Sequence, residues 1–204
     1  SNSKIKTYED YNQMLIKHPE INCVAIMTPS GMHFNHAFQI IKNYKKSVII
    51  EKPTVLRLDQ LKKIYSLAKK KNCKIFPVFQ NRYNKAVQRV YKSINKKEIG
   101  KINIVNVRVR WCRTQRYYDS AKWRGTYSHD GGVLTNQGIH HVDLLRYLGG
   151  EVKKVFCNMK TFGSKIQVED TATASLKFMN GAVGTIEVTT AARPKDYEAS
   201  ISIM

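Results

Sequence analysis

An acid, an amine and a proline follow directly after a short apolar run: residues 47–50 lead into Glu51, Lys52 and Pro53. Three β-branched residues in succession predict a strand buried on both faces. Because an acid and an amine are costly to bury, Glu51 and Lys52 should lie where the strand ends. Pro53 lacks an N–H and should stop the hydrogen bonding between strands at that point. Ligands of open α/β sheets bind at that edge. The pair is a candidate site, with a solvated ion pair as the alternative.

A second polar cluster, residues 136–143, has the composition to move a proton. At helical spacing Asn136 and His140 share a face, and Asp143, three residues after His140, could orient its imidazole. Histidine titrates near neutral pH and is a natural proton carrier. A structural histidine with satisfied hydrogen bonds is the alternative. No metal site is expected here, because the adjacent histidines point apart on a helix and no third ligand is placed.

A loop of mixed aromatic and cationic residues, 111–125, could hold an anionic or flat ligand. It contains Arg113, Tyr118, Trp123 and Arg124. Guanidinium groups pair bidentately with phosphate or carboxylate, and aromatic rings stack on nicotinamide or uracil. The alternative is loop packing with solvated charge.

The elements around these residues change in type near residue 100. Before it, helical spacing alternates with short apolar strands, which predicts an α/β unit with a parallel sheet. We expect helices over 8–17, 33–43, 58–71 and 85–94, and strands over 21–27, 48–50 and 74–79. After it, we expect a mainly antiparallel sheet with one long helix, 136–148, and strands over 102–111, 152–160, 170–178, 182–190 and 198–204.

The formal net charge of +20 attracts anions, which include nucleic acid, anionic membrane and phosphorylated small molecules. Much of the excess is lysine on predicted helix surfaces, which favours solvated faces over a polynucleotide footprint. No nucleic-acid-binding signature occurs, and no apolar run reaches the about 18 residues of a membrane span. We therefore expect neither a nucleic-acid nor a membrane partner. The 4 scattered cysteines form no C-x-x-C pair and suit a reducing cytoplasm.

Three motifs in this order resemble the Gfo/Idh/MocA family of sugar oxidoreductases: residues 28–33, residues 51–53, and Gly131-Gly132 with Gly138-Ile139-His140 and Asp143. Residues 80–84, 117–125 and 130–140 resemble its UDP-N-acetylglucosaminuronate 3-dehydrogenases. The resemblance implies a partial NAD-binding Rossmann domain over 1–83 and a substrate-binding and oligomerisation α+β domain over 84–204. No G-x-G-x-x-G occurs, and the last expected strand has nothing after it. We therefore expect a fragment, truncated at both ends, that binds NAD poorly.

The resemblance also implies an activity: NAD-dependent oxidation of the 3-hydroxyl of a UDP-linked N-acetylhexosaminuronate, in the synthesis of surface-polysaccharide sugars. His140 would take the hydroxyl proton while Lys52 hydrogen-bonds the developing alkoxide. Asn136 stands where many relatives carry Asp. The cofactor would contact Thr28, Pro29, Ser30, His33, Glu51, Lys52, Trp123 and Arg124. The sugar nucleotide would contact Gln80, Arg113, Tyr118, Asn136, Gln137 and His140. A homo-oligomer formed through the sheet domain is expected. The alternative is a non-catalytic nucleotide-sugar-binding or oligomerisation module.

Overall fold

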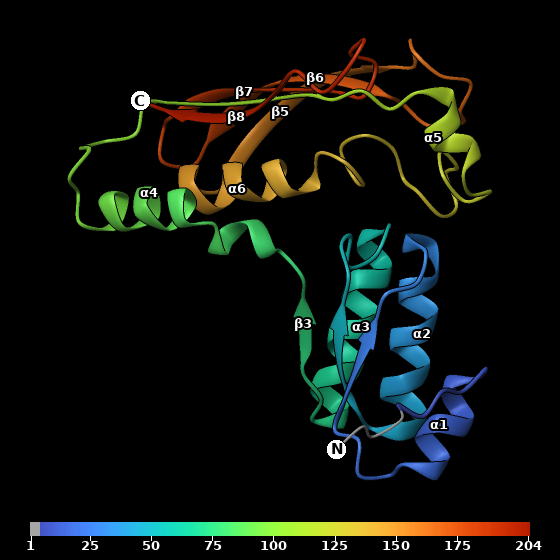
Figure 1. Ribbon diagram of the computed structural model, residues 1–204. Coiled ribbons are helices and arrows are strands. Elements are labelled where there is room, and N and C mark those ends of the chain that lie inside the picture. The colour runs from blue at the N-terminus through green and yellow to red at the C-terminus, as the bar shows by residue number, and fades with distance from the viewer. Residues whose placement is uncertain (1–4) are drawn as a thin grey trace.

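The computed structural model describes residues 5–204, which form two sheets with helices packed against them (Figure 1). The helices are α1 (Tyr11–Lys17), α2 (His33–Gln39), α3 (Leu58–Lys71), α4 (Lys85–Asn95), α5 (Gln115–Asp119) and α6 (Ile139–Gly149). Three further short turns of helix are η1 (Ser30–Met32), η2 (Ile40–Tyr44) and η3 (Gln80–Tyr83). No helix within residues 5–204 is both long and apolar enough to cross a membrane.

The first sheet is parallel, in the order β1-β2-β3, and its strands are β1 (Cys23–Ile26), β2 (Ser47–Ile50) and β3 (Ile75–Pro77). This confirms the α/β unit. One face of the sheet carries the core: side chains of β1 and β2 pack with α1, α2 and α3, through residues such as Leu15, Ala37 and Ile64. Alternate residues along each strand point toward these helices.

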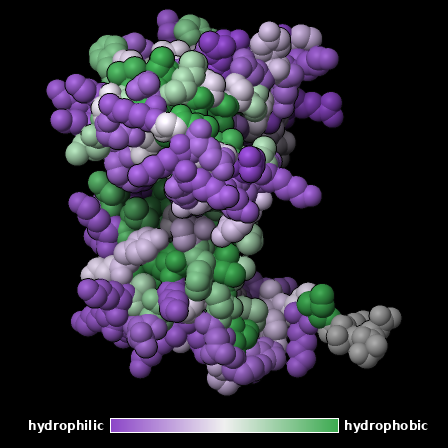
Figure 2. All heavy atoms as spheres, turned by 90° about the vertical axis from the view of Figure 1, so that its left-hand side faces the viewer, coloured by the Kyte–Doolittle hydropathy of each residue, from purple (hydrophilic) through white to green (hydrophobic). Residues whose placement is uncertain are grey.

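The expectation that β2 is buried on both faces is wrong. Val48 and Ile50 are fully buried, whereas Ile49 between them is 36% exposed, and Phe76 beside it on β3 is also exposed. All three helices cover the same face, so the other face has no layer over it among residues 5–204. Figure 2 views the side on which β3 lies in Figure 1, and apolar residues gather there on the N-terminal half.

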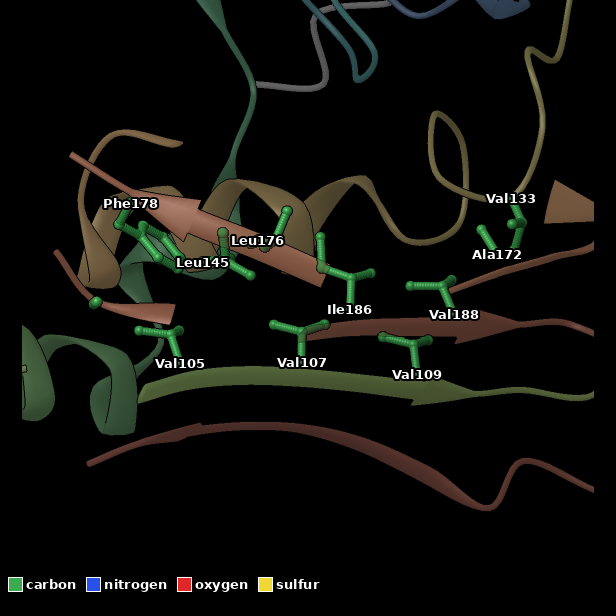
Figure 3. Close-up of a cluster of buried hydrophobic side chains, with 11 residues drawn as sticks. Val105, Val107, Val109, Val133, Leu145, Ala172, Leu176, Phe178, Ile186 and Val188 are labelled. Atoms are coloured by element: carbon green, nitrogen blue, oxygen red, sulfur yellow. The ribbon is translucent and has the colours of Figure 1, made fainter. Parts of the chain in front are cut away.

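The second sheet has the order β5-β6-β7-β4-β8 and is mainly antiparallel, as predicted; only β4 and β7 run parallel. Its strands are β4 (Ile104–Arg110), β5 (Val152–Lys160), β6 (Thr171–Phe178), β7 (Val183–Thr189) and β8 (Glu198–Ile203). Helix α6 packs on one face through Leu145, against valines of β4, Phe178 and Ile186 (Figure 3). Because this face is packed, α6 holds a fixed position above the sheet.

Helix α6 begins at Ile139, three residues later than predicted. The chain before it turns through Gly131 and Gly132, which have φ values of +86° and +90° that favour glycine. Asn136 therefore lies in a turn, and its N–H donates to the Gly132 carbonyl. The expected helical face shared by Asn136 and His140 does not form. Figure 1 shows that this turn and α6 lie on the side of the second sheet that faces the first.

Candidate active site

Lys52 follows β2 and reaches from the first sheet's edge to the second half of the chain. Its Nζ donates hydrogen bonds to the Asn136 main-chain carbonyl and to Asn136 Oδ1, both at 2.9 Å. Glu51 turns back on the chain, and its Oε2 accepts the Lys52 main-chain N–H at 2.8 Å. The Lys52 amine is therefore bound to protein groups, and Glu51 and Lys52 do not form the solvated ion pair that was the alternative prediction. Burial lowers the pKa of Lys52, and the charges of Glu51 and Asp130 oppose that lowering.

Asn136 links this amine to a buried acid. Its side-chain amide donates from Nδ2 to Asp130 Oδ1, while its Oδ1 accepts from Lys52. Asp130 Oδ2 accepts the Gly125 N–H at 2.5 Å. No role was predicted for Asp130, although it directly precedes the Gly131-Gly132 motif; a carboxylate directly before two glycines was the available signal.

His140 is on the first turn of α6 and 9% exposed. Its Nε2 lies 3.4 Å from Gln80 Nε2, and its Nδ1 is buried without a hydrogen-bond partner. Burial, followed by the nearby Lys52 charge, lowers the pKa of His140. The ring is therefore neutral at pH 7, and a lone pair on Nε2 can accept a hydrogen. Lys52 and His140 come from distant segments and act on each other electrostatically.

Asp143 does not orient His140, contrary to expectation. It accepts two hydrogen bonds from Arg82, from Nε at 2.7 Å and from Nη2 at 2.5 Å. The guanidinium also lies over the rings of Tyr147 and Phe79, with centroid distances of 4.8 and 5.5 Å. This contact joins η3, which carries Gln80, to α6, and so it helps to set the position of His140.

The Thr28-Pro29-Ser30 turn follows β1, and His33 lies beneath it. The His33 ring is 1% exposed, with Nδ1 2.7 Å from the Pro53 carbonyl and Nε2 2.8 Å from the Thr28 carbonyl. These two contacts tie the ends of β1 and β2 together.

The loop before Asp130 forms a stack of alternating rings and guanidinium groups. Arg113 lies over Trp111 and Tyr117, with centroid distances of 5.2 and 5.6 Å, and Arg124 lies over Tyr117 and Trp123, at 4.3 and 4.8 Å. Arg113 also donates to Asp196 Oδ1 at 2.9 Å. Arg124 Nε is buried without a partner. The stack thus holds two guanidinium groups in fixed planes.

Tyr118, expected to contact the substrate, is buried, and its hydroxyl hydrogen-bonds Thr190 at 2.8 Å. Its neighbour Tyr117 lies at the site instead and accepts a hydrogen bond from Gln137 Nε2 at 2.9 Å. Consecutive residues of α5 point in different directions, so only one of the two rings can face the site. The sequence offered no signal to choose between them.

No group of three or more potential metal ligands occurs within residues 5–204. A cavity of about 830 Å³ lies around Arg110, Glu187 and Tyr197 and is lined by none of the site residues. The site is instead an edge where two halves meet. It offers a half-buried amine, a neutral imidazole and amide groups, which suit proton transfer and hydrogen bonding to a hydroxyl.

Comparisons with known proteins match two family models to successive parts of the chain. Residues 1–79 match the model of the oxidoreductase family with an NAD-binding Rossmann fold, and residues 87–204 match the GFO/IDH/MocA C-terminal domain. Myo-inositol 2-dehydrogenase of Thermotoga maritima is 28% identical, over 89% of this chain and 53% of that protein. The chain thus spans about half the length of the curated relatives it matches.

Two solved structures are more similar in sequence. The WlbA dehydrogenase of Bordetella pertussis, in complex with NADH and UDP-GlcNAcA, is 36% identical with a TM-score of 0.92, over 96% of this chain and 60% of that one. The corresponding complex from Chromobacterium violaceum is 38% identical with a TM-score of 0.88, over 93% and 56%. The expected family and its nicotinamide cofactor are confirmed: the chain belongs to the Gfo/Idh/MocA oxidoreductases and combines their NAD-binding Rossmann fold with their C-terminal domain.

Proposed function

We propose that the full-length protein uses NAD⁺ to oxidise the 3-hydroxyl of a UDP-linked N-acetylhexosaminuronate, as a step toward surface-polysaccharide sugars. The observation that carries the proposal is the hydrogen bond from Lys52 to Asn136 across the two halves, at 2.9 Å, with His140 near enough for the Lys52 charge to lower its pKa. The two WlbA structures, which hold NADH and UDP-GlcNAcA, support the choice of substrate.

The residues present fit a dinucleotide at this edge. Arg124 Nε is a buried donor without a partner, and a pyrophosphate or ribose oxygen would satisfy it. The turn at residues 28–30 and Glu51 flank the carboxyl ends of β1 and β2, where dinucleotides bind in such sheets. Trp123, whose ring packs on Arg124, would contact the cofactor as well. When bound, NAD⁺ supplies a two-electron acceptor for the substrate carbon.

His140 takes the hydroxyl proton in this proposal. Its lowered pKa keeps the ring neutral at pH 7, so Nε2 has a lone pair available. Gln80, which now lies beside that nitrogen, would release it to the substrate hydroxyl and hold the sugar. Lys52, kept in place by Asn136, donates a hydrogen bond to the oxygen as negative charge develops there.

Further contacts to the sugar nucleotide are assigned to the aromatic loop and the turn before α6. Gln137, next to Asn136 in the chain, donates a hydrogen bond to the Tyr117 hydroxyl, and both groups are polar candidates for the sugar. Arg113 is a candidate for the uronate or the diphosphate, to which it would turn from Asp196. Tyr117 replaces Tyr118 in this proposal because the Tyr118 hydroxyl is used by Thr190.

We also propose a homo-oligomer formed through the second sheet. The face opposite α6 leaves large apolar side chains in water, which favours coverage by another copy: Phe156 and Phe162 are exposed there. A cytoplasmic location would suit the free cysteines and the nucleotide ligands.

The test is to incubate the full-length protein with NAD⁺ and UDP-N-acetylglucosaminuronate. We expect reduced cofactor, measured by absorbance, and a keto-sugar, measured by mass spectrometry. Lys52→Met and His140→Asn should each lower kcat by at least about 100-fold, the usual contribution of a positioned acid or base, with cofactor binding retained. Lys62→Met and His18→Asn, which change surface groups away from the site, should leave kcat unchanged.

Three results would count against the proposal. If neither product forms, the substrate or the activity is wrong. If the protein binds NADH and the sugar nucleotide without turnover, it is the non-catalytic module. If Lys52→Met or His140→Asn turns over normally, that residue has no part in the chemistry.

A further inference from the structure

Asp130 stands one hydrogen-bonded group away from Lys52, on the far side of the Asn136 amide. We propose that Asp130 is a positioning residue: it fixes the Asn136 amide and thereby holds Lys52 as a charged hydrogen-bond donor. Only the effect on turnover rests on the proposed function above. The linkage of Asp130, Asn136 and Lys52 stands on the contacts themselves.

Asp130 is a buried carboxylate without a direct cationic partner. Its side chain is 4% exposed, and no lysine, arginine or histidine forms an ion pair with it in the part of the chain that is described. Its two oxygens accept from the Gly125 N–H and from Asn136 Nδ2. A buried charge is costly unless it is compensated. The remaining compensation comes from the positive charge of Lys52, on the other side of the Asn136 amide.

This carboxylate decides which way the Asn136 amide faces. An ionised carboxylate only accepts hydrogen bonds, so the amide must turn its NH₂ group toward Asp130. Its oxygen then faces Lys52, at 2.9 Å from Nζ. Both hydrogen bonds of the amide are charge-assisted and polarise one another. Without Asp130 the Asn136 amide could turn over, and its NH₂ group, a donor, would then face the Lys52 ammonium, which is also a donor.

Four charged or titratable groups act on the Lys52 amine. Glu51 precedes it, Asp130 and Arg124 face it from the second half of the chain, and His140 lies beside it. Burial and Arg124 favour the neutral amine, while Glu51 and Asp130 favour the charged one. Removal of the Asp130 charge therefore shifts the balance toward a neutral Lys52, which is a weaker hydrogen-bond donor to an alkoxide.

The test measures the amine itself. Full-length wild-type protein and Asp130→Asn are labelled with trace acetic anhydride across a pH series, and the labelling rate of Lys52 is compared with that of Lys62 by mass spectrometry. Only a neutral amine reacts, so Lys52 in Asp130→Asn should label about threefold faster or more at pH 8, with Lys62 unchanged. Asp196→Asn is the matched control, because Asp196 also accepts a main-chain N–H but does not contact Asn136.

A second variant makes the linkage testable even if Asp130→Asn fails to fold. Asn136→Leu keeps the carboxylate and removes the bridge, so it should speed Lys52 labelling as well. Adding Asp130→Asn to Asn136→Leu should then speed labelling by less than Asp130→Asn does in the wild type, because the bridge is already lost and only the charge of Asp130 remains to be removed. Unchanged Lys52 labelling in either folded single variant overturns the proposal. Failure of the wild type to oxidise the sugar would overturn the proposed function alone, because labelling needs no turnover.

Discussion

The contact between Arg82 and Asp143 should stabilise the protein more than an equally short ion pair on the same helix. Arg146, also on α6, lies 2.5 Å from Glu151, the same distance as the shorter Arg82–Asp143 contact. The two pairs differ in burial. The Asp143 side chain is 10% exposed and Arg82 is 41% exposed, whereas Arg146 and Glu151 are 57% and 69% exposed. The comparison therefore separates burial from distance.

The expected magnitudes follow from this difference. Two unit charges 4 Å apart attract by about 4 kcal/mol at an effective dielectric constant of about 20, which is an upper limit here because Arg82 is partly solvated and screened. We expect a coupling energy of about 1.5–3 kcal/mol for Arg82 with Asp143. Loss of Arg82 would leave the nearly buried Asp143 carboxylate unpaired, and loss of Asp143 would leave the guanidinium without its carboxylate. For Arg146 with Glu151 we expect about 0.5 kcal/mol or less.

Two double-mutant cycles measure these energies. Arg82→Gln, Asp143→Asn and the double variant form one cycle; Arg146→Gln, Glu151→Gln and their double variant form the other. Urea unfolding gives the free energy of unfolding of each protein. Coupling energies that are equal in the two cycles, or a value below about 0.5 kcal/mol for Arg82 with Asp143, would refute the claim that burial makes this contact structural. Turnover should also fall in Arg82→Gln, because Gln80 on the same turn contacts His140.

Three further predictions concern stability. Burial lowers the pKa of both His140 and His141, so below about pH 6.5 the unfolded chain binds more protons than the folded protein does. The free energy of unfolding should therefore fall as pH drops from 7 to 5, and it should fall less steeply in His141→Asn. Urea titrations at each pH measure this. Phe178→Ala should cost about 3–5 kcal/mol of unfolding free energy, because the ring is fully buried beneath α6. Gly132→Ala should lower the melting temperature and kcat together, because its φ is +90° and the added Cβ would collide with the Glu169 carboxylate.

Most strands and helices were predictable because each carries a period or an apolar run; the five-residue helix α5 (Gln115–Asp119), in the segment expected to be a loop, was not. The burial of β2 was not, since it depends on how many layers cover the sheet, and Ile49 looks the same in sequence whether or not a helix lies over it. Helix α6 shows the other limit. Its apolar face predicted a helix there, yet its start depends on the distant Lys52 and on two glycines that turn the chain.

Local spacing identified the site residues better than it identified their partners. Asp143 lies three residues after His140, and that spacing suggested a contact within the helix. A guanidinium 61 residues away takes the carboxylate instead, because Arg82 offers two parallel N–H groups in a plane that matches it. A single imidazole cannot offer this geometry. Which of Tyr117 and Tyr118 faces the site was likewise set by the packing of Tyr118 against Thr190.

The turn before α6 explains why the site forms only where the two halves meet. In a helix that began at Asn136, its carbonyl would accept the His140 N–H, four residues on. That carbonyl accepts Lys52 Nζ instead, at 2.9 Å. The late helix start leaves the Asn136 side chain free to lie between Lys52 and Asp130 and places His140 on the first turn, next to Gln80. The hydrogen bond from Lys52 to the Asn136 carbonyl therefore takes the place of a first helical hydrogen bond and also joins Lys52 to the segment that carries His140. Neither half of the chain can build this arrangement alone.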